Sequence, residues 1–280
     1  MNIDSLIKTA LEEDGAFNDI TTKYFVDKNK KAKAILIGKG AGILCGIEIF
    51  ERVFKTLDNE CSFKLNKKDG AAVKVGETIL EIKGRADALL SAERTALNFV
   101  QHLSGIATAA NEFVKLSGKS KAKIFDTRKT IPLYRELAKY AVRCGGAKNH
   151  RIGLSDMALI KDNHLKLIKD LKEAVLSFRK NHKNILVEIE CENLEEIKKA
   201  LQARADIIML DNMSFERTKK AIRFIRENSN NNYKPEIEIS GRVNLETIKK
   251  LYSLDVERIS VGMLTHSPKA LDMSLEITVK

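Results

Sequence analysis

The sequence predicts an α/β protein in which an N-terminal α/β sandwich is followed by an α/β barrel. Its first part reads as helices and strands in the order α-β-α-β-β, and its second part as short apolar runs that alternate with helices. The 280 residues, 44% of them hydrophobic, allow a large core and a second, smaller domain in a soluble globular protein. We expect the sandwich and a spine helix over 1–117 and the barrel over 118–269, with residues 270–280 available to rejoin the sandwich.

The elements expected in the first domain alternate between amphipathic helices and short strands. In order, they are a helix at 2–13, a turn-rich loop at 13–22, a strand at 31–40, a helix at 47–57, strands at 61–66 and 77–84 around an exposed loop at 66–76, and a helix at 86–117. Leu89, Leu97 and Val100 belong to one apolar stripe along the last helix, and Gly118 ends it. Arg94 lies off the densest part of that stripe.

After residue 120, short apolar runs end abruptly in polar residues. The runs are AKIFDTRK, MALIKDNH, ILVEIEC, DIIMLDNMS, EIEISGR and ERISVGMLTHS, and helical stretches are expected at 165–180, 194–203, 215–227 and 245–254. Alternation at this pace indicates parallel βα units. About six such units with charged strand ends favour a barrel, in which functional residues collect at the carboxyl ends of the strands.

The first of these strand ends carry cations beside apolar segments. Arg128 and Lys129 follow one run, His150 and Arg151 follow GGAKN, and Lys161 follows MALI. Desolvating a cation is costly unless an anion compensates it. Arginine suits a planar carboxylate and lysine acts as a point charge, so the pattern predicts a pocket for a dicarboxylate or a phosphate. The alternative is that these are ordinary surface charges.

The later strand ends carry acids and then small residues. Glu190 and Asp211 could hold Mg²⁺, bind ribose hydroxyls or stabilise a developing positive charge, and the alternative is structural ion pairing with nearby lysines. Glu188 shares a strand face with Glu190, which favours a lined interior over a simple pair. Ser240-Gly241 and Gly262 are typical of strand ends where a phosphate approaches the backbone.

Composition excludes several other classes of function. The cysteines and histidines lack metal-site spacing, so no zinc or iron site is expected, and the thiols suit a reducing cytoplasm. The net charge of +11 invites nucleic-acid binding, but aromatic residues are only 6% and the basic residues are spread along the chain. The acidic, amphipathic amino terminus predicts no signal peptide, and no apolar stretch approaches the roughly 20 residues that cross a bilayer. We therefore expect a cytoplasmic protein without nucleic-acid or membrane partners.

Several segments carry a family resemblance. AERTALNFVQHLSGIAT, DTRKT, KNHRIGLSDMALIKDNH, VEIEC and IIMLDNMS closely resemble the quinolinate phosphoribosyltransferases, or carboxylating nicotinate-nucleotide pyrophosphorylases, and the match runs from EDGAFNDITT to the carboxyl terminus. The resemblance implies an incomplete α/β barrel after the sandwich, the type II phosphoribosyltransferase fold. It also implies that phosphoribosyl pyrophosphate and quinolinate react, with Mg²⁺, to give nicotinate mononucleotide, pyrophosphate and CO₂ in de novo NAD synthesis.

The resemblance also implies which residues form the site. The expected quinolinate contacts are Thr127, Arg128, His150, Arg151 and Lys161. The expected contacts to phosphoribosyl pyrophosphate and its metal are Lys129, Glu190 and Asp211. The residues expected on the 5′-phosphate side are Ser240, Gly241, Arg242, Val261, Gly262 and Met263. Lys129, Lys161, Glu190 and Asp211 are the expected catalytic residues, with the acids holding the metal through the substrate. In a homodimer or higher homo-oligomer, Arg94 is expected to reach the partner's pocket.

The sequence departs from the family pattern at four positions. Leu133 and Asn18 stand where glycine is usual, Ala147 ends a usual triple glycine, and Arg242 replaces a small or amide residue beside the expected phosphate site. Two other enzymes stay open as alternatives: a molybdenum-associated paralogue of the same fold, and a Schiff-base barrel enzyme with Lys161 as nucleophile. A basic nucleic-acid-binding protein is the non-enzymatic alternative.

Overall fold

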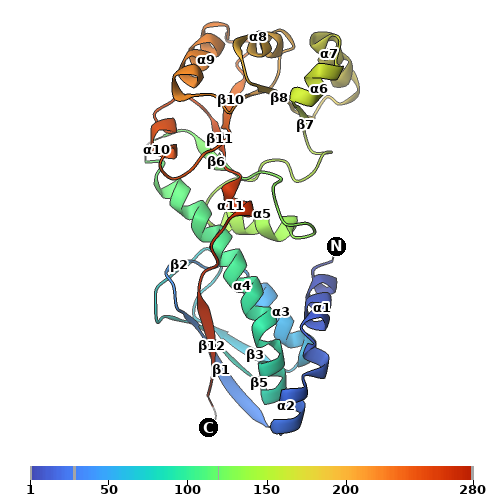
Figure 1. Cartoon of the computed structure of the whole chain (residues 1–280), viewed down its shortest axis with the longest axis vertical. Coiled ribbons are helices and arrows are strands. Elements are labelled where there is room, and N and C mark those ends of the chain that lie inside the picture. The colour runs from blue at the N-terminus through green and yellow to red at the C-terminus, as the bar shows by residue number, and fades with distance from the viewer. Residues whose placement is uncertain (1, 28–29, 119, 279–280) are drawn as a thin grey trace. The chain divides into compact units, whose positions relative to one another are not determined.

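The computed structural model describes residues 2–27, 30–118 and 120–278, and the chain divides into two compact units (Figure 1). The first unit comprises 1–111, 132–146 and 267–280, and the second comprises 112–131 and 147–266. The sequence-based boundary lies between 117 and 118, whereas the units divide at 111/112, and the segment 132–146 is grouped with the first unit. Within the described ranges, no helix has the length and apolar character needed to cross a membrane.

The first unit is built on an antiparallel sheet with strand order β12-β1-β5-β3. These strands are β1 (Lys31–Gly38), β3 (Ser62–Leu65), β5 (Thr78–Arg85) and β12 (Met273–Thr278), so the carboxyl-terminal strand pairs with β1. The helices are α1 (Ile3–Glu13), α3 (Ile47–Leu57), α5 (Arg135–Cys144) and most of α4 (Ala86–Lys115). Phe54 of α3 contacts the Phe63 ring of β3, and Gln101 of α4 donates to the Met273 carbonyl of β12. Helices therefore pack on the sheet, and the predicted sandwich is confirmed.

Two parts of the first unit carry more structure than the sequence indicates. Within the expected loop at 13–22 the chain forms a 3₁₀ turn (η1, Ala16–Asn18) and then α2 (Ile20–Phe25). Asp19 caps α2 because its carboxylate accepts a hydrogen bond from the Thr22 amide. The loop at 66–76 contains β4 (Ala72–Val73), which pairs with β2 (Gly42–Ile43).

The second unit contains a six-stranded parallel sheet with strand order β6-β11-β10-β9-β8-β7. Its strands are β6 (Lys123–Phe125), β7 (Ala158–Ile160), β8 (Val187–Cys191), β9 (Ile207–Asp211), β10 (Glu236–Ser240) and β11 (Arg258–Ser260). In the described part of the chain, β6 and β7 stand at opposite edges and no ladder joins them. The sheet is therefore an incomplete barrel, as the family resemblance implies.

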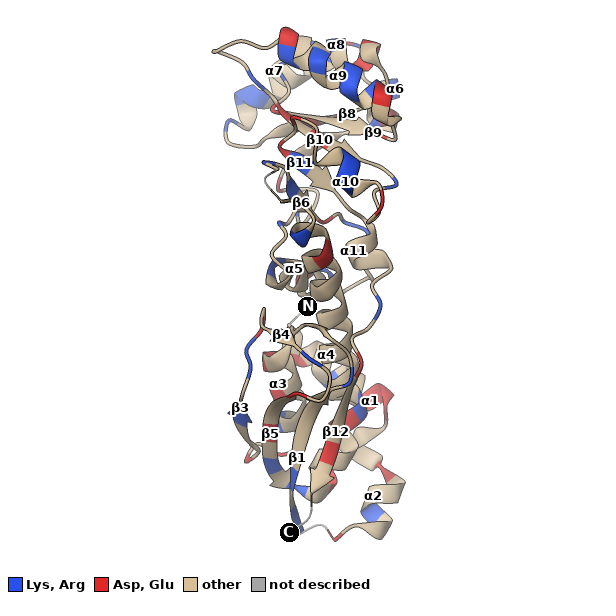
Figure 2. Ribbon diagram, turned by 90° about the vertical axis from the view of Figure 1, so that its left-hand side faces the viewer, with Lys and Arg blue, Asp and Glu red and all other residues tan. Residues whose placement is uncertain are grey.

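The helices of the second unit follow the predicted alternation with shifted bounds. They are α6 (Asp162–Leu167), α7 (Leu171–Asn181), α8 (Leu194–Gln202), α9 (Phe215–Glu227), α10 (Ile248–Leu251) and α11 (Met263–His266). The single helix expected at 165–180 is two helices, because Asp170 begins a new one by accepting from the Glu173 amide. Lysine and arginine are distributed over elements of both units and are not confined to one stripe (Figure 2).

Candidate active site

A pocket of about 470 Å³ lies in the second unit at the carboxyl ends of its parallel strands. Its predicted lining residues are Thr127, Arg128, Lys129, His150, Arg151, Lys161, Glu190, Asp211, Ser240, Gly241 and Arg242. The lining also includes Leu159, Met209, Asn212 and Ser260, which sequence reasoning missed. The expected cations and acids therefore meet in one cavity.

Sheet register explains why residues far apart in the sequence converge here. Asp211 and Ser240 are paired positions at the ends of β9 and β10, and Glu190 is paired with Met209. The segment before His150 runs beside β6, because Lys148 bridges to Phe125. The Asp126 carboxylate then accepts a 2.7 Å hydrogen bond from the His150 amide, which fixes the entry of that segment into the pocket.

Two arginines present partly unsatisfied guanidinium groups. Arg151 donates through Nη1 to the Met157 carbonyl at 3.0 Å. The buried Nε atoms of Arg128 and Arg151 have no hydrogen-bond partner within residues 2–27, 30–118 and 120–278. Burial, and then the charge of Arg128, lowers the pKa of Arg151. Arg128 and Arg151 are neighbouring cations whose Nε–H groups remain available as donors, so an anion that contacts both would be stabilised.

Lys161 and Glu190 form an ion pair across the pocket, with 3.2 Å between Nζ and Oε2. Burial raises the pKa of Glu190, the Lys161 ammonium opposes this effect, and the charge of Asp211 adds to it. The structural ion pair considered from the sequence is therefore present for Glu190. Because the Lys161 side chain is 46% exposed, a substrate anion can still approach the ammonium.

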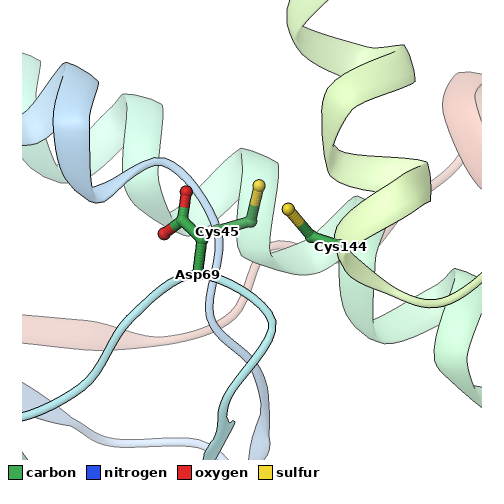
Figure 3. A group of neighbouring side chains, drawn as sticks. All are labelled: Cys45, Asp69 and Cys144. Atoms are coloured by element: carbon green, nitrogen blue, oxygen red, sulfur yellow. The ribbon is translucent and has the colours of Figure 1, made fainter.

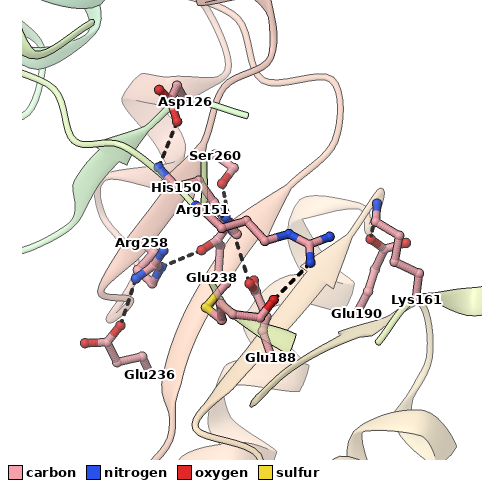
Figure 4. A network of polar contacts seen from close by, with 11 residues as sticks. Asp126, His150, Arg151, Lys161, Glu188, Glu190, Glu236, Glu238, Arg258 and Ser260 are labelled. Carbon is pink, nitrogen blue, oxygen red and sulfur yellow. Dashed lines mark hydrogen bonds and ion pairs between the residues drawn. The ribbon is translucent and has the colours of Figure 1, made fainter. Parts of the chain in front are cut away.

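A buried acidic cluster, Glu188 and Glu238, lies next to His150 of the pocket lining, and Figure 4 draws its polar contacts. Nε2 of His150 lies 3.1 Å from Glu188 and 3.4 Å from Glu238, and both acids are fully buried. Arg258 donates to Glu238 at 2.5 Å, and the Ser260 hydroxyl donates to the same carboxylate. The inward orientation of Glu188, anticipated from strand alternation, is confirmed. Glu238 was missed, although the alternation in EIEIS carries the same signal.

The proton on His150 is held toward these acids. Burial would lower the pKa of His150, but the hydrogen bonds and charges of Glu188 and Glu238 outweigh burial and raise the pKa to about 9. Nδ1 lies 2.8 Å from the Arg151 amide, which can donate to it only while Nδ1 is unprotonated, so the doubly protonated ring that the acids favour would lose this hydrogen bond. In either protonation state, Nε2–H faces the acids.

The loop after β9 and the loop after β10 pack closely against each other at Gly241. Gly241 has φ +94°, and a Cβ built on it would lie 2.3 Å from Oδ1 of Asn212, so only glycine fits without movement. Asn212 and Arg242 also have left-handed backbones, and the Asn212 amide donates to the Ser240 carbonyl at 3.1 Å. Left-handed backbone conformations are unfavourable for residues other than glycine, so their presence at Asn212 and Arg242 is consistent with a site that holds its backbone amides in a set arrangement.

The remaining expected phosphate residues lie next to the pocket lining. Val261 is buried and donates through its amide to the Phe125 carbonyl, and Met263 begins α11. A Cβ on Gly262 would lie 3.3 Å from Cδ of Lys129, so glycine gives that lysine its space. The hydroxyl of Thr265 donates to the Lys129 carbonyl at 2.8 Å and ties α11 to the same loop.

Arg94 lies on an exposed position of α4 in the first unit, beside the buried Thr95. Its expected reach into a partner's pocket stays a prediction. Leu133 has φ +63°, in the left-handed region, which accounts physically for the glycine usual at this place in the family.

Two carboxylates of the pocket are of the ligand type that Mg²⁺ prefers. Glu190 and Asp211 both line the pocket and offer carboxylate oxygens, which suit Mg²⁺. Among the described residues, the groups of three potential ligands are Cys45 with Asp69 and Cys144, and His150 with Glu188 and Glu238. Neither group contains Glu190 or Asp211, so among the described residues these two acids belong to no group of three potential ligands.

Comparison with known proteins extends over nearly the whole chain. The N-terminal and C-terminal domain families of quinolinate phosphoribosyl transferase match residues 19–104 and 106–276. A probable nicotinate-nucleotide pyrophosphorylase (carboxylating) of Methanocaldococcus jannaschii is 41% identical over 97% of this chain and 96% of its own length. The nicotinate-nucleotide pyrophosphorylase (carboxylating) of Mycobacterium leprae is 36% identical over 97% of this chain and 95% of its own.

A solved structure gives the same result for the fold. The crystal structure of NadC from Streptococcus pyogenes has a TM-score of 0.91 and 41% sequence identity, and the match covers 99% of this chain and 96% of that one. With both domain families matched in order and the cations and acids gathered at the strand ends, the chain belongs to the quinolinate phosphoribosyl transferase family.

Proposed function

We propose that the protein transfers the phosphoribosyl group of phosphoribosyl pyrophosphate to quinolinate with decarboxylation, giving nicotinate mononucleotide, pyrophosphate and CO₂ for de novo NAD synthesis. It is then a pentosyltransferase, a carboxylating nicotinate-nucleotide pyrophosphorylase. The observation that carries the proposal is the pocket itself, in which Arg128, Arg151 and Lys161 face the acids Glu190 and Asp211. The names and coverage of the relatives support it.

Quinolinate is a planar dianion, and the cationic side of the pocket supplies matching charge. The buried Nε–H groups of Arg128 and Arg151, which have no hydrogen-bond partner among the described residues, can donate to its carboxylates, and Lys161 adds a point charge. Thr127 lies beside them in the lining. Holding both carboxylates orients the ring nitrogen toward the anomeric carbon of the second substrate.

The acidic side suits the transition state of transfer. As the bond from ribose to pyrophosphate lengthens, positive charge grows on the sugar, and the carboxylates of Glu190 and Asp211 favour that charge. Lys129, which lies in the same pocket, neutralises negative charge that develops on the leaving pyrophosphate. When Mg²⁺ is bound with phosphoribosyl pyrophosphate, it supplies further charge neutralisation at the phosphates, and Glu190 and Asp211 are the residues that would hold it.

The second half of the reaction is the loss of CO₂. Once the ring nitrogen has formed its bond to ribose, the C–C bond to the adjacent carboxylate breaks, CO₂ leaves, and the electron pair stays on the ring carbon beside the positively charged nitrogen. A nearby ammonium stabilises the resulting carbanion until it takes a proton, and Lys161 is the residue proposed for this role. Ser240, Gly241 and Arg242, which line the pocket, are proposed to hold the 5′-phosphate, with Val261, Gly262 and Met263 beside them.

We further propose that the working form is a homodimer or a higher homo-oligomer, with Arg94 of each subunit completing the other subunit's site. Mixing two inactive variants, Arg94→Ala and Lys161→Ala, tests this. Random reassortment in a dimer makes half the molecules heterodimers with one intact site each, so about a quarter of the wild-type activity should return. If the mixed dimers form and no activity returns, Arg94 is not shared across subunits. Cytoplasmic location is proposed because the reduced thiols suit it.

The activity is tested directly by incubating the purified protein with quinolinate, phosphoribosyl pyrophosphate and Mg²⁺. The expected products are nicotinate mononucleotide and CO₂ in equal amounts, both absent when Mg²⁺ is omitted. Failure to form nicotinate mononucleotide from a folded, dimeric preparation rejects the proposal. Borohydride trapping of a carbonyl substrate on Lys161 would instead support the Schiff-base alternative.

A further inference from the structure

The thiols of Cys45 and Cys144 face each other within the first unit (Figure 3). Cys45 lies between β2 and α3, and Cys144 is the last residue of α5. Their sulfur atoms and a carboxylate oxygen of Asp69 all lie within 4.8 Å of one another. Cys45 is buried and Cys144 is half-buried, so the two thiols differ in their access to solvent.

The backbone around both thiols is held in place. The Ser104 hydroxyl accepts a hydrogen bond from the Cys45 amide at 2.9 Å and donates to the Cys45 carbonyl at 3.2 Å. After Cys144, a Cβ on Gly145 would lie 2.3 Å from the Ala107 carbonyl oxygen, which shows how closely the end of α5 packs on α4. The approach of the two sulfurs is therefore set by the packing of the unit.

A metal ion is a poor explanation for this cluster. The Asp69 carboxylate already accepts hydrogen bonds from the Gly46 amide, the Ile47 amide and the Tyr140 hydroxyl, at 3.0, 3.1 and 2.8 Å. Asp69 thus caps the start of α3. Among the residues that the structure describes, the cluster offers a metal two thiols and one carboxylate that already accepts hydrogen bonds. A structural zinc site uses four protein ligands.

The surroundings make Cys144 the more acidic of the two thiols and Cys45 the less acidic. The hydrogen bond from Cys45 lowers the pKa of Cys144, and the Tyr140 hydroxyl and the Arg143 charge lower it further. Burial and the negative charge of Asp69 oppose these effects but do not outweigh them. The same contact and burial raise the pKa of the Cys45 thiol. Thiolate character and exposure decide which cysteine reacts first with an oxidant, and both favour Cys144.

We propose that Cys144 and Cys45 form a redox-modification site, in which a peroxide oxidises Cys144 and Cys45 then closes a reversible disulfide. The Cys144 thiolate attacks one peroxide oxygen of H₂O₂, breaks the O–O bond and becomes a sulfenic acid, releasing hydroxide. The Cys45 sulfur then attacks the Cys144 sulfur and displaces a second hydroxide. Each hydroxide takes up one thiol proton, so two thiols and one peroxide give one disulfide and two water molecules, with two electrons passing to the peroxide.

The proposal is compatible with a reducing compartment. The dithiol in the structure is the resting state, and glutathione or thioredoxin would return the disulfide to it. The disulfide would link the end of α5 to the start of α3, across residues that are distant in the sequence.

The test uses the full-length protein, treated with a few equivalents of H₂O₂, alkylated and mapped by mass spectrometry. The expected result is a peptide pair joined through Cys45 and Cys144, loss of two of the four free thiols, and recovery of both with dithiothreitol. Cys61→Ala and Cys191→Ala are matched controls, because both thiols are buried and neither is in the cluster; the linkage should persist in each. In Cys45→Ala, Cys144 should accumulate as sulfenic acid, detected with dimedone.

Two results would overturn the proposal, and the wild-type protein alone can give both. One is that no disulfide to Cys45 forms: Cys144 is oxidised to sulfinic acid instead, or it stays unmodified at a peroxide concentration that oxidises free cysteine. The other is a purified protein that contains one equivalent of zinc whose removal exposes both thiols, which would make the cluster a metal site instead.

Discussion

The Nε2 atom of His150 lies 3.1 Å from Oε2 of Glu188, and both side chains are buried. On its other side, the His150 ring accepts from the amide of Arg151. The ring is therefore held between a buried acid and the backbone of a residue proposed to bind quinolinate. Glu188 has no place in the pocket lining, so any effect on turnover passes through His150 and Arg151, and Glu188 is a positioning residue.

Replacing Glu188 with Leu should lower kcat/KM for quinolinate, because it removes the acceptor that holds the His150 ring. A misplacement of the order of 1 Å costs about 100-fold in rate, and Glu188→Gln, which keeps an acceptor, should lose less. Glu236→Gln is the control for loss of a nearby carboxylate, since Glu236 contacts Arg258 of the same cluster but is 51% exposed. Steady-state kinetics on folded variants check this; kinetics for Glu188→Leu that equal those of the control would remove the positioning role.

Replacing Arg151 with Ala should reduce kcat/KM for quinolinate by about 30- to 900-fold, equivalent to the roughly 2–4 kcal/mol that a preorganised charged contact provides. The fold should survive, because the guanidinium makes one hydrogen bond to a carbonyl and is otherwise partly unsatisfied. Lys219→Ala, at an exposed position of α9, serves as the control for loss of one positive charge. A loss of similar size in both variants would point to a general charge effect.

Glu190→Gln should raise the thermal stability at pH 7 while it lowers activity. Burial raises the pKa of Glu190 in the folded protein above its unfolded value, so the folded state binds the proton more tightly. The stability from this carboxyl is fully present below the unfolded pKa and is lost as pH rises through the raised folded pKa. The gain in Tm for Glu190→Gln should therefore shrink toward pH 4.

The control for this pH dependence is Glu192→Gln, at an exposed position two residues away. It should leave Tm unchanged at both pH values. Lys161, which loses its partner in Glu190→Gln, is 46% exposed and can be hydrated, so it should not offset the gain. A lower Tm for Glu190→Gln at pH 7 would mean that the ion pair outweighs the burial of Glu190.

Gly241→Ala should destabilise the second unit and raise KM for phosphoribosyl pyrophosphate. A left-handed backbone costs an L-residue about 1–2 kcal/mol, and here the new Cβ would also collide with Asn212. Gly76→Ala separates the two effects, because Gly76 has φ +79° but open space around its Cβ position. Denaturant unfolding should show the larger loss for Gly241→Ala, and an equal loss in both variants would show that the contact with Asn212 relaxes freely.

The sequence predicted best the features that repeat along it. Apolar runs that end in charged residues marked the strand ends, and parallel pairing then necessarily brought Arg128, Lys161, Glu190 and Asp211 to one edge. The predicted helix bounds agreed with the observed ones where apolar residues recur over several turns, as in Phe215–Glu227. These features depend on local pattern and on a sheet topology with few alternatives.

Features that depend on contacts between distant residues were missed. Glu238 and Arg258 lie on different strands, and only their parallel pairing, Glu238 with Arg258, makes one the partner of the other. The facing thiols of Cys45 and Cys144 likewise have no signature in spacing. Short elements such as α2 and β4 also escaped, because one cap or one pair of backbone hydrogen bonds decides them.

The central claim is that Arg128, Arg151 and Lys161 hold both carboxylates of quinolinate, and calorimetric binding of two ligands tests it most directly. Quinolinate and nicotinate share the ring but differ by one carboxylate. The wild-type protein should bind quinolinate at least about tenfold more tightly than nicotinate, since one charged contact is worth 1.4 kcal/mol or more, and Arg151→Ala should lose most of that preference. Equal affinities for the two ligands in the wild-type protein, or a preference unchanged in Arg151→Ala, would contradict it.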